Sequence, residues 1–193
     1  MNILYIHGFK SQFKEQSEKV QALKTLGNVF GVTLDYTNTF DEIKKILLKF
    51  ALDKDMDIEL IVGTSLGGYY SSVIGASAGV PFVAINPVVD PVLTLSKYIG
   101  DGFTFTGEAY TLKEETVRAY PGFALDGCGL ILLDRGDELI NSEKTLATLK
   151  DHYDTKIFEG GSHRFQHINE SLTEIKSYFN RASFVYGFGA TDD

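Results

Sequence analysis

The chain has 193 residues, of which 44% are hydrophobic, and this suits one folded domain with a substantial core better than two domains or a disordered protein. Its formal net charge of −8 argues against a nucleic-acid partner, and no apolar run reaches the roughly 18 residues of a membrane-spanning helix. The chain has a single cysteine, Cys128, and no signal-peptide pattern, so we expect a cytoplasmic protein without an intrachain disulfide or a membrane partner.

Short apolar runs rich in β-forming residues recur along the chain and predict strands. Fully apolar runs of this length are typical of strands buried on both faces of a parallel sheet. The expected strands are 3–6, 32–36, 58–62, 81–85, 130–134 and 156–158. Segments with helical periodicity alternate with them, so we expect a single-domain α/β fold with a mostly parallel sheet of about six strands and helices on both faces. The domain is expected to span 1–181, followed by a C-terminal tail over 182–193.

Amphipathic patterns between the expected strands predict the helices. Apolar residues spaced at three-residue intervals between 20 and 26 predict a first helix, which Gly27 is expected to end. Thr39 and Glu42 have the spacing of a capping box at the start of the next helix. Further helices are expected around 146–149 and 172–179.

The stretch from about 90 to 126 departs from this alternation, because it contains no expected strand and is rich in aromatic residues. An excursion this long in a domain of this size is more often functional than not. We therefore expect a short helical lid over a site, with Phe103, Phe105 and Tyr110 as candidate contacts to a substrate. The same aromatics could equally belong to the core, and the sequence does not decide between the two interpretations.

A serine stands between two glycines in the sequence GTSLG, directly after the expected strand at 58–62 and before an expected helix. This is the context of a nucleophile elbow, G-x-S-x-G, in which a sharp turn exposes the serine hydroxyl at the end of a sheet. Gly63 and Gly67 suit it because side chains there would collide with the tight turn. Taken alone, the pattern could also simply close a turn between a strand and a helix. The candidate nucleophile is Ser65.

A serine nucleophile needs a base and a residue that orients the base. Among the four histidines, His163 is the best candidate, because it lies in a glycine-containing loop after the last expected strand. The acid should follow an earlier strand, and LLDRGD offers two aspartates. Asp137 is preferred because the turn through Gly136 can swing it towards His163. Asp134 ends the strand, and its expected role is to cap the backbone or to pair with Arg135.

The oxyanion of a tetrahedral intermediate also needs hydrogen-bond donors, and backbone N–H groups suffice. The expected donors are the N–H of Leu66, directly after the serine, and that of Phe9, in the loop after the first strand. His163 and His167 are four residues apart, but no nearby carboxylate or cysteine completes a metal site. Phosphate-binding glycine motifs are also missing from the sequence, so we expect no metal and no cofactor.

With these motifs in view, the chain resembles the α/β-hydrolase superfamily, and more closely the small YqiA-like esterases of bacteria. The resemblance covers YIHGF, GTSLGGYY, NPVVDP, FTGEAY, LLDRGDE and GGSHRF. It implies a serine esterase or thioesterase with a short lid and a triad of Ser65, Asp137 and His163. Its substrate would be a small acyl ester or thioester. Two alternatives stay open: a hydrolase-shaped binding module that turns nothing over, and an acyltransferase that uses the same site.

Overall fold

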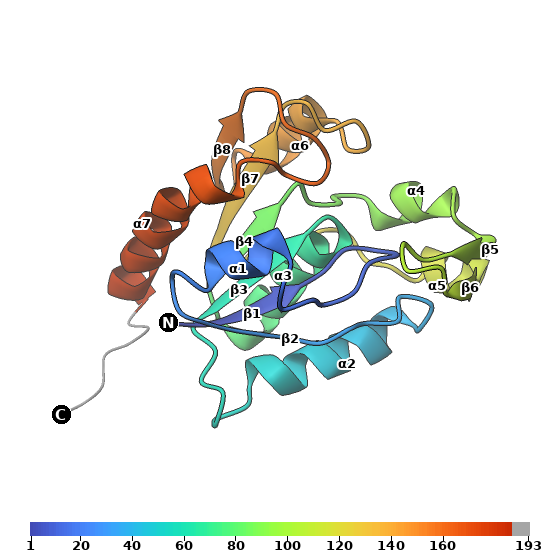
Figure 1. Cartoon of the computed structure of the whole chain (residues 1–193), viewed down its shortest axis with the longest axis horizontal. Coiled ribbons are helices and arrows are strands. Elements are labelled where there is room, and N and C mark those ends of the chain that lie inside the picture. The colour runs from blue at the N-terminus through green and yellow to red at the C-terminus, as the bar shows by residue number, and fades with distance from the viewer. Residues whose placement is uncertain (187–193) are drawn as a thin grey trace.

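The computed structural model describes residues 1–186, and its centre is a six-stranded sheet with helices on both faces (Figure 1). The strands lie in the order β2-β1-β3-β4-β7-β8, and every neighbouring pair is parallel. They are β1 (Asn2–Ile6), β2 (Asn28–Gly31), β3 (Leu60–Thr64), β4 (Phe82–Ile85), β7 (Gly129–Asp134) and β8 (Asp154–Phe158). The helices are α1 (Glu18–Leu23), α2 (Phe40–Ala51), α3 (Leu66–Ala78), α4 (Pro91–Ser96), α5 (Glu114–Arg118), α6 (Ser142–Leu149) and α7 (Ile168–Tyr186). The expected parallel α/β fold is confirmed.

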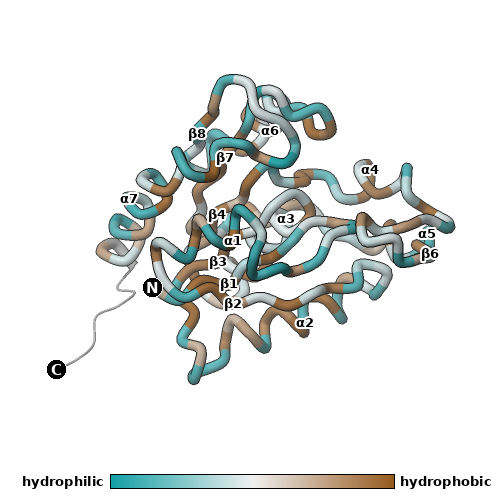
Figure 2. The backbone as a smooth tube through the Cα atoms, in the orientation of Figure 1, coloured by the Kyte–Doolittle hydropathy of each residue, from teal (hydrophilic) through white to brown (hydrophobic). Residues whose placement is uncertain are grey.

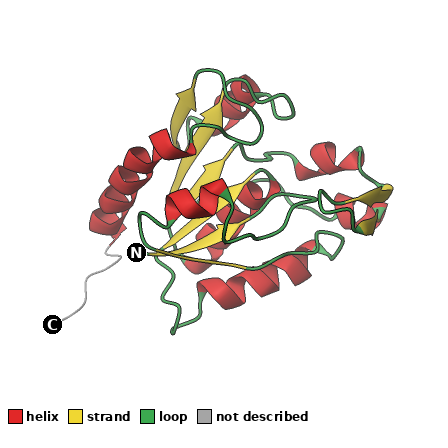
Figure 3. Ribbon diagram, in the orientation of Figure 1, coloured by secondary structure: helices red, strands yellow, loops and turns green. Residues whose placement is uncertain are grey.

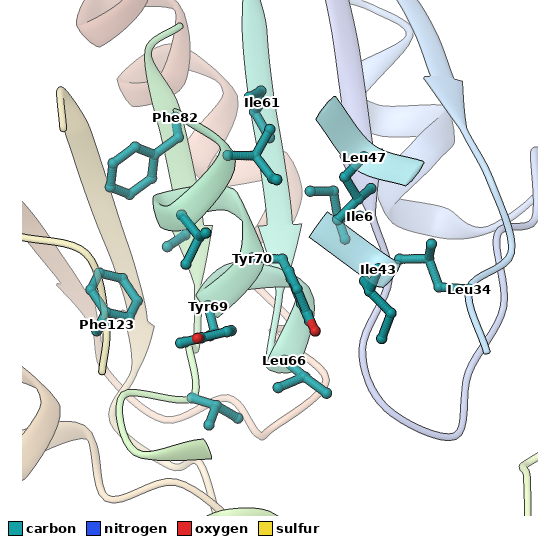
Figure 4. Close-up of a cluster of buried hydrophobic side chains, with 14 of the residues drawn as sticks. Ile6, Leu34, Ile43, Leu47, Ile61, Leu66, Tyr69, Tyr70, Phe82 and Phe123 are labelled. Atoms are coloured by element: carbon teal, nitrogen blue, oxygen red, sulfur yellow. The ribbon is translucent and has the colours of Figure 1, made fainter. Parts of the chain in front are cut away.

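Alternate residues of the strands point to opposite faces of the sheet, and each face has its own core. One core joins the sheet to α2, α3 and α6, and part of it is drawn in Figure 4, with Ile6 and Ile61 of the strands and Tyr70 of α3 among the labelled side chains. The other core joins the sheet to α1 and α7. In Figure 2 the central strands are accordingly hydrophobic along their length. This two-sided burial explains why the strand sequences read as continuous apolar runs.

The second strand lies earlier in the chain than expected, so the prediction of a strand at 32–36 is wrong. β2 ends at Gly31, after which the backbone leaves the strand ladder. The N–H of Leu34 donates instead to Nε2 of His7 (2.8 Å), and the hydroxyl of Tyr36 donates to the carbonyl oxygen of His7 (2.5 Å). Leu34 and Tyr36 are nevertheless buried, which gives this segment the apolar pattern of a strand.

The excursion between β4 and β7 is only partly the helical lid that was expected. After α4 the chain forms a two-stranded antiparallel hairpin, β5 (Gly100–Phe103) and β6 (Ala109–Leu112), and then α5 (Figure 3). We call β5 and β6 the lid hairpin. Its turn contains Gly107 at φ 86°, a conformation that favours glycine. Strands of four residues are too short to show a clear alternation in the sequence.

The helix ends were predicted with mixed success. The capping box of α2 is confirmed: Thr39 Oγ1 accepts from the N–H of Glu42, and the Glu42 carboxylate accepts from the N–H of Thr39. α1 ends at Leu23, so Gly27 does not end it as expected. Glycine is needed at position 27 because a Cβ there would lie 1.9 Å from the carbonyl oxygen of Met1.

α7 continues past the domain boundary that was expected at residue 181. It runs to Tyr186, and Ala182 is buried within the core on that face of the sheet. The rest of the expected tail, 187–193, lies outside the described residues. No helix within residues 1–186 is both long and apolar enough to cross a bilayer.

Candidate active site

The candidate site lies at the carboxyl ends of β1 and β3, where the chain changes the direction in which it adds strands to the sheet. In open α/β sheets such a switch point leaves a crevice beyond the strand ends. Here the loop after β1, with Gly8 and Phe9, and the turn after β3, with Ser65 and Leu66, line one cleft of about 550 Å³. The fold therefore places the predicted serine in the crevice where such sheets bind ligands.

Ser65 connects β3 to α3 in a sharp turn. Its φ of 57° and ψ of −119° lie outside the regions that residues with a Cβ favour. The turn requires glycine on both sides: a Cβ at Gly63 would lie 2.0 Å from the carbonyl oxygen of Gly67, and one at Gly67 would lie 2.1 Å from that of Ile6. The N–H of Ser65 donates to the carbonyl oxygen of Ile85 (2.9 Å), which ties the turn to β4.

His163 lies in the loop between β8 and α7, and its ring contacts two other candidates. Nε2 is 3.0 Å from Oγ of Ser65, and Nδ1 is 2.8 Å and 3.0 Å from the carboxylate oxygens of Asp137. The Asp137 side chain is 1% exposed and that of His163 is 18% exposed. An ionised carboxylate can only accept, so Nδ1 carries a proton, and in the neutral ring Nε2 accepts from the serine hydroxyl. The structure thus brings Ser65, His163 and Asp137 into one connected row.

Asp137 is held by the loop that carries it. Its Oδ1 accepts from the N–H groups of Leu139 and Ile140, both at 2.8 Å. The preceding Gly136 packs against the loop of His163, where its N–H donates to the carbonyl oxygen of Gly160 (2.7 Å). The loops after β7 and β8 are therefore hydrogen-bonded to each other. Backbone N–H groups hold the carboxylate of Asp137 in place facing the imidazole of His163.

Asp134, the other acid considered, contacts both ends of the His163 loop instead of the His163 ring. It is fully buried at the end of β7. Its Oδ2 accepts from the N–H groups of Ser162 (3.1 Å) and Gln166 (2.8 Å), and its Oδ1 accepts from Nδ1 of His167 (2.7 Å). Of the two roles expected for Asp134, the interaction with the backbone is the one present. Arg135 pairs instead with two exposed glutamates, Glu143 and Glu159.

Asn86 is a buried residue of the site that the sequence reasoning missed. It follows β4 in a left-handed conformation, at φ 42°. Its Oδ1 accepts from the N–H of Asp134 (2.8 Å), and its amide donates to the carbonyl oxygens of Ser162 (3.0 Å) and His163 (3.4 Å). It bridges the ends of two strands and the His163 loop. An asparagine followed by proline directly after a buried strand is the signal that could have identified it.

His7, buried at the start of the loop after β1, fixes the peptide that carries Phe9. Its Nε2 accepts from the N–H of Leu34 (2.8 Å) and so has no proton, while Nδ1 donates to the carbonyl oxygen of Gly8 (2.8 Å). Burial lowers the pKa of His7, which favours this neutral form. In a trans peptide the C=O and N–H point in opposite directions, so the N–H of Phe9 points away from His7.

The N–H groups of Phe9 and Leu66 are the predicted oxyanion donors. Both residues line the cleft beside Ser65, and neither N–H donates to a backbone or side-chain acceptor anywhere in residues 1–186. The loop before Phe9 passes close to the serine, because a Cβ at Gly8 would lie 3.1 Å from Cβ of Ser65. Two unused donors therefore border the same cleft as the serine hydroxyl.

The three lid aromatics lie in different places. Phe105, although 72% exposed, lines the cleft that contains Ser65. Tyr110 lines a neighbouring groove of about 460 Å³ and packs on Phe9, with 5.5 Å between ring centroids. Phe103 is 65% exposed and lines neither the cleft nor the groove. Of the three predicted substrate contacts, only Phe105 shares a cavity with the serine.

The described residues do not gather three or more His, Cys, Asp or Glu side chains in an arrangement that could hold a metal ion. His163 and His167, which the sequence places four apart, turn to different aspartates.

Sequence comparisons with known proteins find one family. The model of the Uncharacterised protein family (UPF0227) matches residues 2–180. A UPF0227 protein of Vibrio parahaemolyticus is 29% identical over 92% of this chain and 99% of its own length. Another, from Pectobacterium atrosepticum, is 26% identical over 91% of this chain and 97% of its own length.

Among solved structures, Est1E from Butyrivibrio proteoclasticus matches with a TM-score of 0.70 at 18% identity, covering 93% of this chain and 87% of that one. Alpha/beta hydrolase domain-containing protein 10 from mouse gives a TM-score of 0.69 at 16% identity, with coverage of 93% and 89%. The esterase domain of a Rhodothermus marinus protein gives 0.63 at 15% identity, with coverage of 96% and 86%. These likenesses confirm the α/β-hydrolase fold that the motifs predicted.

Proposed function

We propose that this chain, which belongs to the uncharacterised protein family UPF0227, is a serine hydrolase that cleaves carboxylic esters or acyl thioesters through an acyl-enzyme on Ser65. The observation that carries the proposal is the row of contacts from Oγ of Ser65 through His163 to Asp137, at 3.0 Å and 2.8 Å. A nucleophile, a base and an orienting acid operate at such separations. Solved structures of similar fold whose titles name esterases add support at the level of the fold.

In the acylation step, Oγ of Ser65 attacks the acyl carbonyl carbon while Nε2 of His163 takes the hydroxyl proton. The carboxylate of Asp137 keeps Nδ1–H in place and stabilises the imidazolium that forms. The negative charge on the former carbonyl oxygen is stabilised by the N–H groups of Phe9 and Leu66. His163 then gives its proton to the leaving alcohol or thiol as the carbon–oxygen or carbon–sulfur bond breaks.

In the deacylation step, water takes the place of the leaving group beside His163. Nε2 removes a proton from the water as its oxygen attacks the ester carbon of the acyl-enzyme, and the same donors stabilise the second oxyanion. Collapse of this intermediate returns the proton to Oγ of Ser65 and releases the carboxylic acid. No other acid, base or metal is needed to balance the cycle.

A binding module with the same fold would have no need for the strained backbone of Ser65. A non-glycine residue in such a conformation costs on the order of 1–3 kcal/mol, and a glycine at that position would avoid the cost. The conformation is useful only if a side chain must be raised into the cleft. This favours catalysis over binding.

Labelling with a fluorophosphonate, followed by mass spectrometry, tests the proposal. The folded protein should form one adduct, on Ser65, and should hydrolyse p-nitrophenyl esters. Ser65→Ala should abolish labelling and lower turnover by about 10⁴ or more. Ser162→Ala is the matched control, because Ser162 lines the same cleft but contributes only backbone contacts, and it should label like the wild type. Folded protein without an adduct on Ser65 would support the binding module.

A further inference from the structure

The cleft around Ser65 is positively charged, although the whole chain carries −8. Its charged lining residues, apart from the imidazole of His163, are Lys10, Lys19, Lys97 and Arg164 against a single acid, Glu18. Within residues 1–186 none of these four cations has a carboxylate within 4.0 Å. A cleft lined by one sign of charge concentrates ligands of the opposite sign.

The charge is partly balanced at the His163 end of the cleft. Burial lowers the pKa of Lys19, while neighbouring Glu18 acts in the opposite direction. At the same end, the N–H of His163 and, to a smaller extent, the guanidinium of Arg164 lower the pKa of Glu138. Glu18 directly precedes Lys19 and lines the same cleft, and the carboxylate of Glu138 accepts from the N–H of His163, the residue before Arg164 (2.9 Å). Among the described residues that line the cleft, no acid comes from the lid segment.

At the lid end, Lys10 and Lys97 share one aromatic ring. Their Nζ atoms lie 5.5 Å and 5.1 Å from the centre of the Tyr98 ring, and Nζ of Lys10 is also 5.4 Å from the centre of the Phe105 ring. Each ammonium is attracted to the ring or rings that it contacts, so both charges are held at the Tyr98 ring. We call Lys10 and Lys97 the lid-side cation pair. A bound anion would be attracted to both charges, and the two rings would cover an apolar chain leading to it.

The lid-side cation pair is attached directly to the loop that carries the oxyanion donor. Lys10 follows Phe9, and the rings of Tyr98 and Phe9 pack with 5.3 Å between centroids. Lys10 has a left-handed backbone at φ 64°, a conformation that costs free energy in a residue with a Cβ. Its carbonyl oxygen accepts from the N–H of Phe105 (2.8 Å). The backbone of Lys10 is thus held against the lid, and its ammonium contacts two rings.

The chemistry of the proposed reaction assigns this end of the cleft to the acyl group. The leaving group has to lie beside Nε2 of His163, at the end where Nζ of Lys19 donates to the carbonyl oxygen of Arg164. Building on the proposed function, we infer that the acyl group of the substrate ends in an anionic substituent that binds to the lid-side cation pair. A monoester of a dicarboxylic acid is the simplest such substrate.

Matched esters test this inference. Mono-p-nitrophenyl adipate and p-nitrophenyl hexanoate have the same six-carbon acyl chain and leaving group, and differ in the terminal carboxylate. We expect kcat/KM to be about tenfold or more higher for the adipate ester, as for one good charge-assisted contact. The preference should shrink in 0.5 M salt, which screens exposed charges. The methyl ester of the adipate substrate, which is neutral and only one methyl group longer, should behave like the hexanoate.

The variants Lys10→Met and Lys97→Met locate the effect. The readout is the ratio of kcat/KM for adipate over hexanoate within each variant, so that a general loss of activity cancels. We expect the ratio to approach one in the double variant and to stay at the wild-type value in Lys150→Met, an exposed lysine at the end of α6. A ratio near one in the wild type would overturn the inference and leave the proposed function standing.

A further arm separates the two ends of the cleft. 3-Carboxy-4-nitrophenyl hexanoate carries its charge on the leaving group, and a preference for this ester over the adipate ester would overturn the assignment to the acyl side. If no ester is hydrolysed, the proposed function fails, and calorimetric binding of adipate against hexanoate to Ser65→Ala still decides the inference. Tighter binding of adipate that depends on Lys10 and Lys97 supports it, and equal binding rejects it.

Discussion

Asparagine substitutions at Asp134, which ends β7, and at Asp137, in the loop after it, should have different effects, because the two carboxylates have different partners. The first should lower stability and the second should lower turnover. In Asp137→Asn, the new amide can donate to Nδ1 of His163 and so hold the proton on Nε2. That tautomer cannot accept the proton of Ser65. In other serine triads the equivalent change costs about 10⁴ in kcat, and we expect a loss on the order of 10³ to 10⁴ with little change in KM or melting temperature.

The same substitution at Asp134 should mainly lower stability. The buried carboxylate accepts from the N–H groups of Ser162 and Gln166 and from the ring of His167. Asparagine keeps one oxygen and turns an amide nitrogen towards at least one of these donors. One unmet buried donor costs about 1–3 kcal/mol. For a chain of this length that corresponds to roughly 2–12 °C in melting temperature. Turnover per folded molecule should stay within about tenfold of the wild type.

Both properties can be measured on the same preparations, with kcat and KM on a p-nitrophenyl ester and melting followed by circular dichroism. Asp151→Asn, at an exposed position after α6, serves as the control for the substitution itself. The reasoning is refuted by the reverse ranking, in which Asp134→Asn is the inactive variant and Asp137→Asn is the unstable one. Near wild-type turnover in both would mean that another group orients His163.

Three further outcomes are expected. His7→Gln keeps an acceptor for Leu34 but loses the donor to Gly8, so kcat should fall by about 10² with KM within about threefold, as for a misplaced oxyanion donor. Because burial lowers the pKa of His7, the unfolded chain binds a proton there below about pH 6.5 while the folded chain does not, so stability is present above that pH and falls below it. Urea unfolding at pH 7.5 and 5.5 should show a smaller loss in His7→Gln than in the wild type, and an equal loss would contradict the lowered pKa. Ser65→Gly should raise the unfolding free energy by about 1 kcal/mol, because glycine accepts the backbone conformation of Ser65, whereas Ser65→Ala should show no gain.

Local chemistry explains which features could be predicted from the sequence. The elbow around Ser65 and the capping box at Thr39 depend on residues close together in the chain, so their patterns are visible in it. The end of β2 depends on a hydrogen bond between Leu34 and the ring of His7, across a separation of 27 residues. The hydrogen bonds of Asn86 to Asp134 and Ser162 form only because β4, β7 and the loop after β8 lie side by side. No local sequence pattern indicates that arrangement.

The strand order also has a kinetic consequence. Ser65 and His163 are 98 residues apart, and the row that joins them exists only after β3, β4, β7 and β8 have paired in turn. Parallel pairings need crossover connections, and contacts between distant residues form slowly because the entropy of closing the loop is lost first. On dilution from urea, helical circular dichroism should therefore return before ester hydrolysis. Recovered activity would then report the last step of folding, when the far edge of the sheet closes.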